Sequence, residues 1–245
     1  MGKELLKRGF LPLECDITKP DQVDRAIHKI KPDLLIHLAG NSDVEYCQKL
    51  GNEKEVILTN VRGTSNVFES LHKLKLPGVF LSTDQVWHGG YFEKHKEESK
   101  LTPAVNFYAM TKVAAESIVQ SLDMNIIRTS YLFNWERLGA VSTNQPVFIR
   151  RSFLHLQDFC DLLENYCNHF YKMPKILHLA GSETVSWYRF ISNVFPGSNV
   201  KPRFFEKEGF APRPWFGGLD VRLSLQLGFP KRSYLDGIER MKYES

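Results

Sequence analysis

The order of apolar and polar residues up to Phe133 predicts alternating strands and helices. Residues 32–40 form a nearly continuous apolar run that ends at Gly40, as expected for a strand covered by helices on both faces. Similar short runs predict the other strands, at 11–16, 78–83 and 125–133. Apolar residues at helical spacing predict helices at 19–30, 53–74 and 108–122. Because helices of about ten or more residues connect these strands, the pattern predicts an α/β fold with a doubly wound parallel sheet.

Beyond Phe133 the alternation weakens, and the tail is rich in proline, glycine and aromatic residues. One more helix and one more strand are expected, at 158–171 and 176–180. We therefore expect two parts. A Rossmann-like dinucleotide-binding domain comprises 1–132 and 150–180, and a small, mainly C-terminal substrate lobe comprises 133–149 and 181–245.

The composition excludes several classes of function. The chain has 245 residues, of which 42% are hydrophobic and 24% charged, and no apolar run approaches the roughly 20 residues that cross a bilayer. The N-terminus does not resemble a signal peptide, so the cytoplasm is the expected location and no membrane partner is expected. The net charge of +4 is dispersed, which argues against nucleic acid but suits a small anionic ligand. The four cysteines and eight histidines show neither disulfide nor metal-ligand spacing, so we expect no metal site.

Tyr108 and Lys112 are the strongest candidates for chemistry. Ligands of a doubly wound sheet bind at the carboxyl ends of its strands, and the helix with this pair follows a strand that ends in Ser82, Thr83 and Asp84. Residues four apart share one face of a helix. A cation beside a phenol favours the phenolate and brings the tyrosine toward useful acid/base strength at neutral pH. Ser82 or Thr83 would add a hydroxyl donor for the developing oxyanion.

A second pair with the same spacing, Tyr171 and Lys175, has a different interpretation. Pro174 lies between the two residues and would break the helix that has to align them. We therefore assign chemistry to Tyr108 and Lys112.

Motifs along nearly the whole chain recur together in one known family. They are Ser82-Thr-Asp-Gln-Val-Trp-His-Gly89, Pro103 to Tyr108 with Lys112, Ile127-Arg-Thr-Ser-Tyr131, Ala180-Gly181 with Ser186-Trp187-Tyr188, and Ala211-Pro-Arg-Pro214 with Leu219-Asp220 and Leu227-Gly228. In combination they resemble the extended short-chain dehydrogenases/reductases, and most closely the dTDP-4-dehydrorhamnose reductases.

The resemblance implies a role for each matching position. Thr83 would be the hydroxyl donor and Tyr108 the proton donor, while Lys112 would tune Tyr108 and hold the nicotinamide ribose. The implied cofactor is NADPH or NADH, in contact with Gly2, Asp16, Ile17, Leu38, Ala39, Gly40, Asn60, Ser82, Tyr108 and Lys112. The implied substrate is a nucleotide sugar, in contact with Asp84, Gln85, Tyr131 and Arg213.

Three of these assignments have simpler structural alternatives of equal weight. Asp16 could cap a helix, residues 39–40 could be only a tight turn at a strand end, and Arg213 could be a solvated surface charge.

The activity that the resemblance implies is reduction of a 4-keto-6-deoxy nucleotide sugar. Two departures leave alternatives open: Gln85 stands where these reductases usually carry a tyrosine, and residues 134–151 are shorter than the segment that normally forms a helix of the substrate lobe. One alternative is a catalytically idle dinucleotide-binding regulatory subunit, like the regulatory chain of methionine adenosyltransferase. The other is a nucleotide-sugar epimerase or dehydratase. A homodimer is compatible with the sequence, which leaves the oligomeric state open.

The N-terminus departs from the family pattern as well. Family members open with a strand and a G-x-x-G-x-x-G loop whose amides hold the pyrophosphate. Residues 2–10 match the helix after that loop, with Gly2 where its last glycine would fall. We therefore expect the start of the protein to lie roughly a dozen residues upstream, enough for one short strand and the loop.

This expectation predicts the upstream gene sequence and a binding result. The codons before Met1 should encode an apolar strand of about five residues and two glycines three apart. The 245-residue form should bind NADH and NADPH poorly beside an N-terminally extended form, because it lacks the loop amides that meet the pyrophosphate. Calorimetric titration of both forms tests this, and micromolar binding by the 245-residue form would contradict it.

Overall fold

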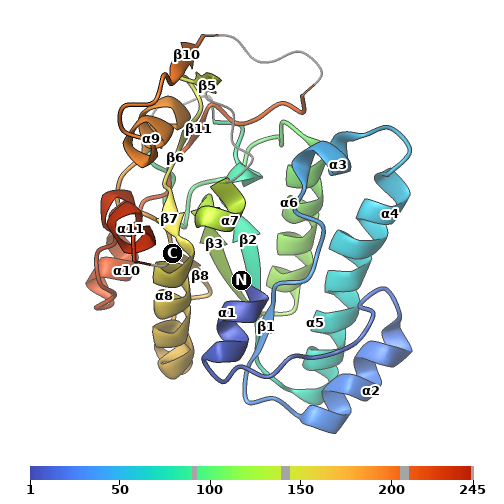
Figure 1. Cartoon of the computed structure of the whole chain (residues 1–245). Helices are drawn as coiled ribbons and strands as arrows, with labels where there is room; N and C mark the ends of the chain where they lie inside the picture. Colours follow the sequence, from blue (N-terminus) through green and yellow to red (C-terminus); the bar gives the residue numbers. More distant parts are fainter. Residues whose placement is uncertain (90–92, 139–143, 205–209, 244–245) are drawn as a thin grey trace.

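A parallel sheet of four strands forms the centre of the molecule (Figure 1). The computed structural model describes residues 1–89, 93–138, 144–204 and 210–243. In spatial order the strands are β1 (Leu35–His37), β2 (Gly78–Thr83), β3 (Asn125–Thr129) and β8 (Ile176–His178). Their register pairs Leu35 with Gly78, Val79 with Asn125, and Ile126 with Ile176. The predicted parallel α/β architecture is therefore confirmed.

Helices cover both faces of this sheet. One face is packed by α2 (Pro20–Ile30), α5 (Gly63–Leu74) and α6 (Phe107–Ser121). The other face is packed by α1 (Gly2–Lys7) and α8 (Leu156–Asn168). Neighbouring residues of β2 divide between the two cores, since Val79 packs with α8 and Phe80 packs with α5 and α6. This double burial is the reason why the strands are continuous apolar runs rather than alternating ones.

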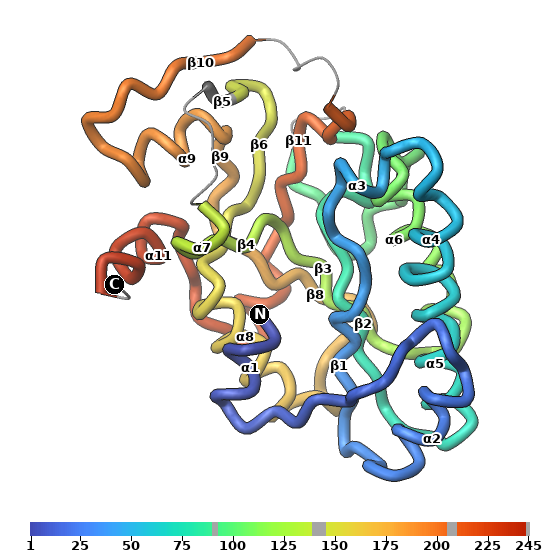
Figure 2. The backbone as a smooth tube through the Cα atoms, turned by 45° about the vertical axis from the view of Figure 1, so that its right-hand side comes forward, coloured from blue at the N-terminus to red at the C-terminus, as the bar shows by residue number. Residues whose placement is uncertain are grey.

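Three sequence predictions differ from the structure. The strand predicted at 125–133 is divided into β3, in the central sheet, and β4 (Leu132–Phe133), in a separate small sheet. The helix predicted at 53–74 is interrupted by a π-helical turn, so that it comprises α4 (Glu53–Ile57), η1 (Leu58–Arg62) and α5. Residues 11–16 form no strand, because they make no backbone ladder with any strand in the described ranges. Figure 2 follows this segment as it leads from α1 to α2. An apolar run becomes a strand only where a neighbouring strand accepts its hydrogen bonds.

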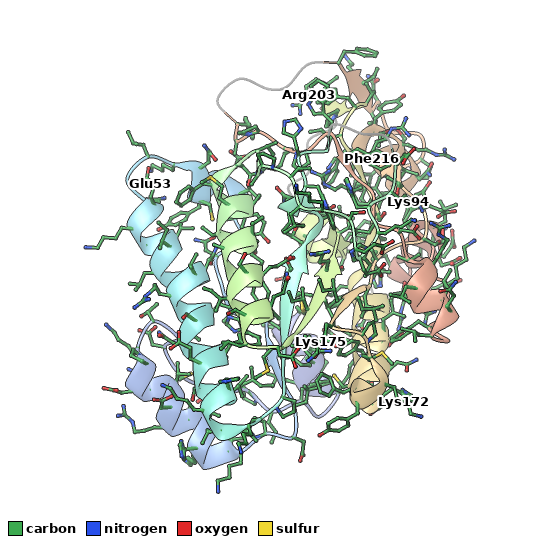
Figure 3. The ribbon with its side chains drawn as sticks, turned by 180° about the vertical axis from the view of Figure 1, so that it is seen from behind. Glu53, Lys94, Lys172, Lys175, Arg203 and Phe216 are labelled. Atoms are coloured by element: carbon green, nitrogen blue, oxygen red, sulfur yellow. The ribbon has the colours of Figure 1, made fainter. Side chains whose placement is uncertain are left out.

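The remaining elements are shorter and lie outside the central sheet. The short helices are α3 (Val44–Gln48), α7 (Trp135–Leu138), α9 (Trp187–Val194), α10 (Arg222–Gln226) and α11 (Tyr234–Met241), with 3₁₀ turns η2 (Asp84–Val86) and η3 (Phe170–Lys172). The small sheets are β4 (Leu132–Phe133) with β7 (Leu154–His155), β5 (Asn144–Pro146) with β10 (Lys201–Arg203), and β6 (Arg150–Arg151) between β9 (Val185–Ser186) and β11 (Phe216–Gly217). In Figure 3, Arg203 and Phe216 mark these sheets at one end of the molecule, while Lys175, just before β8, marks the amino end of the central strands. The predicted division into domain and lobe stays a prediction.

A bidentate ion pair is buried between α6 and β3. Arg128 donates from Nε and Nη2 to the two carboxylate oxygens of Glu116, at 2.9 and 2.8 Å. The Arg128 side chain is 2% exposed and that of Glu116 0%. The guanidinium lies 4.8 Å from the ring centroid of Trp87 and also donates to the carbonyl of Glu97, at 3.1 Å. The pair therefore joins the helix that carries Tyr108 to the middle of the sheet.

None of the helices in the described ranges combines the length and the apolar character needed to cross a membrane.

Breaking the buried pair is expected to destabilise the fold strongly. Glu116→Ala leaves the Arg128 charge buried without a counter-ion, which should lower the free energy of unfolding by about 3–5 kcal/mol. Joint replacement by Arg128→Met and Glu116→Leu should recover most of this loss, since no charge is then buried. Urea unfolding followed by tryptophan fluorescence measures both effects. Glu239→Ala, which breaks an exposed pair with Lys242, is the control and should cost less than about 1 kcal/mol. Equal effects of Glu116→Ala and the control would contradict the prediction.

Candidate active site

A cavity of about 680 Å³ opens at the carboxyl ends of β1, β2 and β3, which is a typical volume for a small-molecule site. Almost all residues predicted from the sequence line it. They are Gly2, Leu38, Ala39, Gly40, Asn60, Ser82, Thr83, Asp84, Gln85, Tyr108, Lys112, Tyr131 and Arg213. The parallel sheet explains this convergence, because the ends of its strands meet at one edge.

Asp16 and Ile17 do not line the cavity. The Asp16 carboxylate accepts hydrogen bonds from the backbone N–H and the hydroxyl of Thr18, at 2.9 and 2.7 Å, and these bonds lower its pKa. The Ile17 side chain packs against Gly63, where a Cβ atom would lie 2.7 Å from Cδ1 of Ile17. Both residues thus shape the turn before α2, and a contact with adenine stays a prediction.

Tyr108 is a buried phenol at the start of α6, with 8% of its surface exposed. Burial raises its pKa above the ordinary value, and the nearby Asp84 carboxylate acts in the same direction. A hydrogen bond with the Thr83 side chain opposes this rise only in part. The phenol is therefore protonated at neutral pH. Lys112 is not among the groups that shift the pKa of Tyr108 here, and its role as the residue that tunes Tyr108 stays a prediction.

The Lys112 side chain is held by contacts with β2. Its Nζ donates to the carbonyl oxygen of Leu81 at 2.6 Å and lies 3.9 Å from the ring centroid of Phe80. Burial lowers the pKa of Lys112 to about 7, and the Glu116 carboxylate opposes this shift. At neutral pH the amine thus exchanges protons readily, one helical turn from the phenol.

Asp84 belongs to a buried polar cluster on the other side of Thr83. Its Oδ2 accepts a hydrogen bond from Ser130 Oγ at 2.6 Å and lies 3.4 Å from Nε of Arg151. Burial raises the pKa of Asp84, whereas the Arg151 charge and the bond from Ser130 lower it. A Cβ atom at Gly217 would lie 2.6 Å from Asp84 Oδ2, so only glycine fits there. Sequence reasoning missed Arg151, because an arginine in a segment without clear periodicity resembles a surface charge.

Asn60 supports a wall of the cavity from the π-helical turn. Its Oδ1 accepts from the backbone N–H of Asn41 at 2.7 Å, and its Nδ2 donates to the Asn41 carbonyl at 2.9 Å. Nδ2 also lies 3.1 Å from the Thr111 hydroxyl. Gly40 has a φ of +148°, and a Cβ atom there would lie 3.0 Å from Asn60 Oδ1. Residues 39–40 are therefore part of a braced loop at the cavity.

Tyr131 and Arg213 also line the cavity. The Tyr131 ring packs edge to face on Trp187, with 4.6 Å between centroids. Arg213 Nη2 donates to Glu45 Oε1 at 2.8 Å, and Nη1 donates to the Ala211 carbonyl at 2.7 Å. Arg213 is therefore held in an ion pair, which contradicts the alternative of a freely solvated surface charge.

The residues present are suited to a nicotinamide dinucleotide. The buried hydroxyls of Ser82 and Thr129 line the cavity and have no hydrogen-bond partner within the described ranges. They lie at the ends of adjacent strands, where they can bind the polar groups of a ligand. No group of three or more metal-ligating side chains was found in the described part of the chain.

The names of several related proteins are those of enzymes that act on nucleotide sugars. The chain is 23% identical over 229 residues to the spore coat polysaccharide biosynthesis protein SpsK of Bacillus subtilis, covering 87% of this chain and 80% of that protein. It is 25% identical over 199 residues to dTDP-4-dehydrorhamnose reductase of Aggregatibacter actinomycetemcomitans, covering 74% of this chain and 67% of that protein.

The fold and the sequence point to the same group. The crystal structure of dTDP-4-dehydrorhamnose reductase from Bacillus anthracis in complex with NADP has a TM-score of 0.81 and 26% identity, covering 94% of this chain and 87% of that chain. The orthologue from Clostridium acetobutylicum, with a TM-score of 0.78 and 22% identity over 92% of this chain and 85% of that chain, shares the fold. The model of the family described as RmlD substrate binding domain matches residues 3–159. The chain therefore belongs to the RmlD substrate-binding domain family.

Proposed function

We propose that this chain is an NAD(P)H-dependent reductase of a 4-keto-6-deoxy nucleotide sugar, similar to dTDP-4-dehydrorhamnose reductase. The observation that carries the proposal is the protonated phenol of Tyr108, which lies in the cavity with Thr83 and Lys112. Family membership and the NADP complex of the Bacillus anthracis enzyme support both the cofactor and the substrate class.

The mechanism follows from the protonation states. The nicotinamide, when bound, supplies the hydride for the carbonyl carbon of the sugar. Tyr108 donates its phenolic proton to the carbonyl oxygen, and the Thr83 hydroxyl donates a hydrogen bond to the same oxygen. The Lys112 amine, whose pKa is lowered to about 7, can then provide a positive charge that stabilises the tyrosinate.

Four other residues that line the cavity would hold the nucleotide sugar. Asp84 and Gln85 follow the strand that ends at Thr83, and their polar groups can bind the sugar hydroxyls. Tyr131 offers an apolar ring face as well as a hydroxyl, while Arg213 offers a cation for phosphate. A homodimer is compatible with this proposal.

A nucleotide-sugar dehydratase is a second candidate. The chain is 29% identical over 116 residues to human dTDP-D-glucose 4,6-dehydratase, although this covers only 47% of this chain and 32% of that protein. A dehydratase has to recover its cofactor in each cycle, so tightly held NAD should co-purify with the protein. A reductase should instead oxidise added NADPH or NADH in proportion to the sugar supplied.

Tyr108→Phe should abolish reduction. We expect kcat for dTDP-4-dehydrorhamnose to fall at least about 100-fold, because no phenolic proton remains for the carbonyl oxygen. Cofactor oxidation at 340 nm by the protein expressed from its full gene measures this rate. Tyr171→Phe is the matched control: it alters the other tyrosine placed four residues before a lysine, is 89% exposed, and should leave the rate unchanged. Equal rates for Tyr108→Phe and the parent would overturn the mechanism.

Lys112→Met should stabilise the fold while it removes activity. The pKa of Lys112 is about 7 in the folded chain and near 10.4 in the unfolded chain. Between these values the unfolded chain binds more protons, so stability rises with pH and the cost of burying Lys112 is largest at pH 7 and below. We expect the Tm of the variant to exceed that of the parent by roughly 2–6 °C at pH 7, and by less at pH 10.

Differential scanning calorimetry at both pH values measures this difference, with Lys175→Met as the control at an exposed lysine. A variant less stable than the parent at pH 7 would contradict the assigned pKa shift.

A further inference from the structure

Asn106 caps the helix that carries Tyr108 and Lys112. Its Oδ1 accepts a hydrogen bond from the backbone N–H of Ala109 at 2.8 Å, and the residue is 3% exposed. An N-cap needs only a side-chain oxygen, so serine, threonine or aspartate would serve equally well. The amide nitrogen of Asn106 is not needed for the cap.

That nitrogen has two partners at the cavity. Nδ2 of Asn106 donates to Oε1 of Gln85 at 3.0 Å and to the carbonyl oxygen of Pro212 at 2.8 Å. Gln85 lines the cavity directly after Thr83 and Asp84, while Pro212 precedes Arg213, which also lines it. One buried amide therefore joins the start of the Tyr108 helix, the end of β2 and the C-terminal segment.

The C-terminal segment involved, residues 211–214, forms a strap that lines the cavity through Arg213. Glu45 holds its first part by accepting from the Ala211 N–H and from Arg213, each at 2.8 Å. Arg151 holds its last part by donating to the Pro214 carbonyl at 2.9 Å. Between these contacts lies the bond from Asn106, which joins the strap to the helix that bears the proposed proton donor.

We propose that Asn106 is a positioning residue, whose amide group sets the distance between Tyr108 and the substrate-side strap. This inference rests on the proposed reductase function. Gln85 is its partner, because the side-chain carbonyl oxygen of Gln85 accepts the amide proton. A shift of the substrate relative to the reacting groups lowers kcat/KM, so a link between the Tyr108 helix and the strap affects kcat/KM although it touches neither substrate nor cofactor.

Asn106→Ser separates positioning from capping, since serine keeps the capping oxygen and removes both amide bonds. We expect KM for the nucleotide sugar to rise roughly 10-fold, the scale of one lost hydrogen bond with its unpaired partner. KM for NADPH should change little, whereas the Tm should fall, because Gln85 Oε1 and the Pro212 carbonyl lose their donor. The control is Asn52→Ser at the N-cap of α4, where Nδ2 donates to the Tyr46 carbonyl outside the cavity. It should leave both KM values unchanged.

Hydrogen exchange gives a second readout that does not depend on activity. In Asn106→Ser the backbone amide of Ala109 should stay protected, whereas the amide of Ala211, which donates to Glu45, should exchange about 10-fold faster. Unchanged exchange of the strap together with unchanged KM would overturn the role of Asn106. A fall in Tm without any change in KM or strap exchange would reduce it to a structural cap. If the parent protein reduces no keto sugar, the proposed function fails, while the exchange result still decides whether Asn106 positions the strap.

Discussion

The buried ion pair of Arg128 and Glu116 holds the site helix against the sheet, and the geometry of the cavity depends on it. Both charges are removed from water, so the pair is favourable only because its geometry is bidentate and the guanidinium has further partners in Trp87 and Glu97. Glu116 lies one turn after Lys112 on the same helix. The carboxylate thus anchors α6 and also opposes the loss of the lysine proton.

Burial sets the protonation states around the sheet edge. It keeps the Tyr108 phenol protonated and brings the pKa of Lys112 to about 7. It also lowers the pKa of His37 to about 3, so this neighbour of Lys112 stays neutral and adds no repulsion. A neutral acid beside an amine near its titration point is a suitable arrangement for proton transfer at neutral pH. The same apolar surroundings that stabilise the fold therefore tune the chemistry.

Much of the fold and of the site could be predicted from the sequence, because strands buried on two faces leave continuous apolar runs and their ends converge. The segment 11–16 was mispredicted since strand formation depends on a neighbour, which local sequence does not reveal. Arg151 was missed because its contact with Asp84 joins distant parts of the chain. The sequence could not show that Lys112 donates to the Leu81 carbonyl, because packing sets the direction of that side chain.

The strap at 211–214 has a consequence for the order in which the protein acquires its parts. All four strands of the central sheet are present once residue 178 has left the ribosome, so the core can form early, as domains do during synthesis. The strap with Arg213 is synthesised later and then docks on the folded core. A ligand that contacts both the strand ends and Arg213 stabilises the docked C-terminal segment, and it does so more strongly as more of the protein is occupied. Proteolytic cleavage before the strap would leave a folded sheet with an open, one-sided cleft.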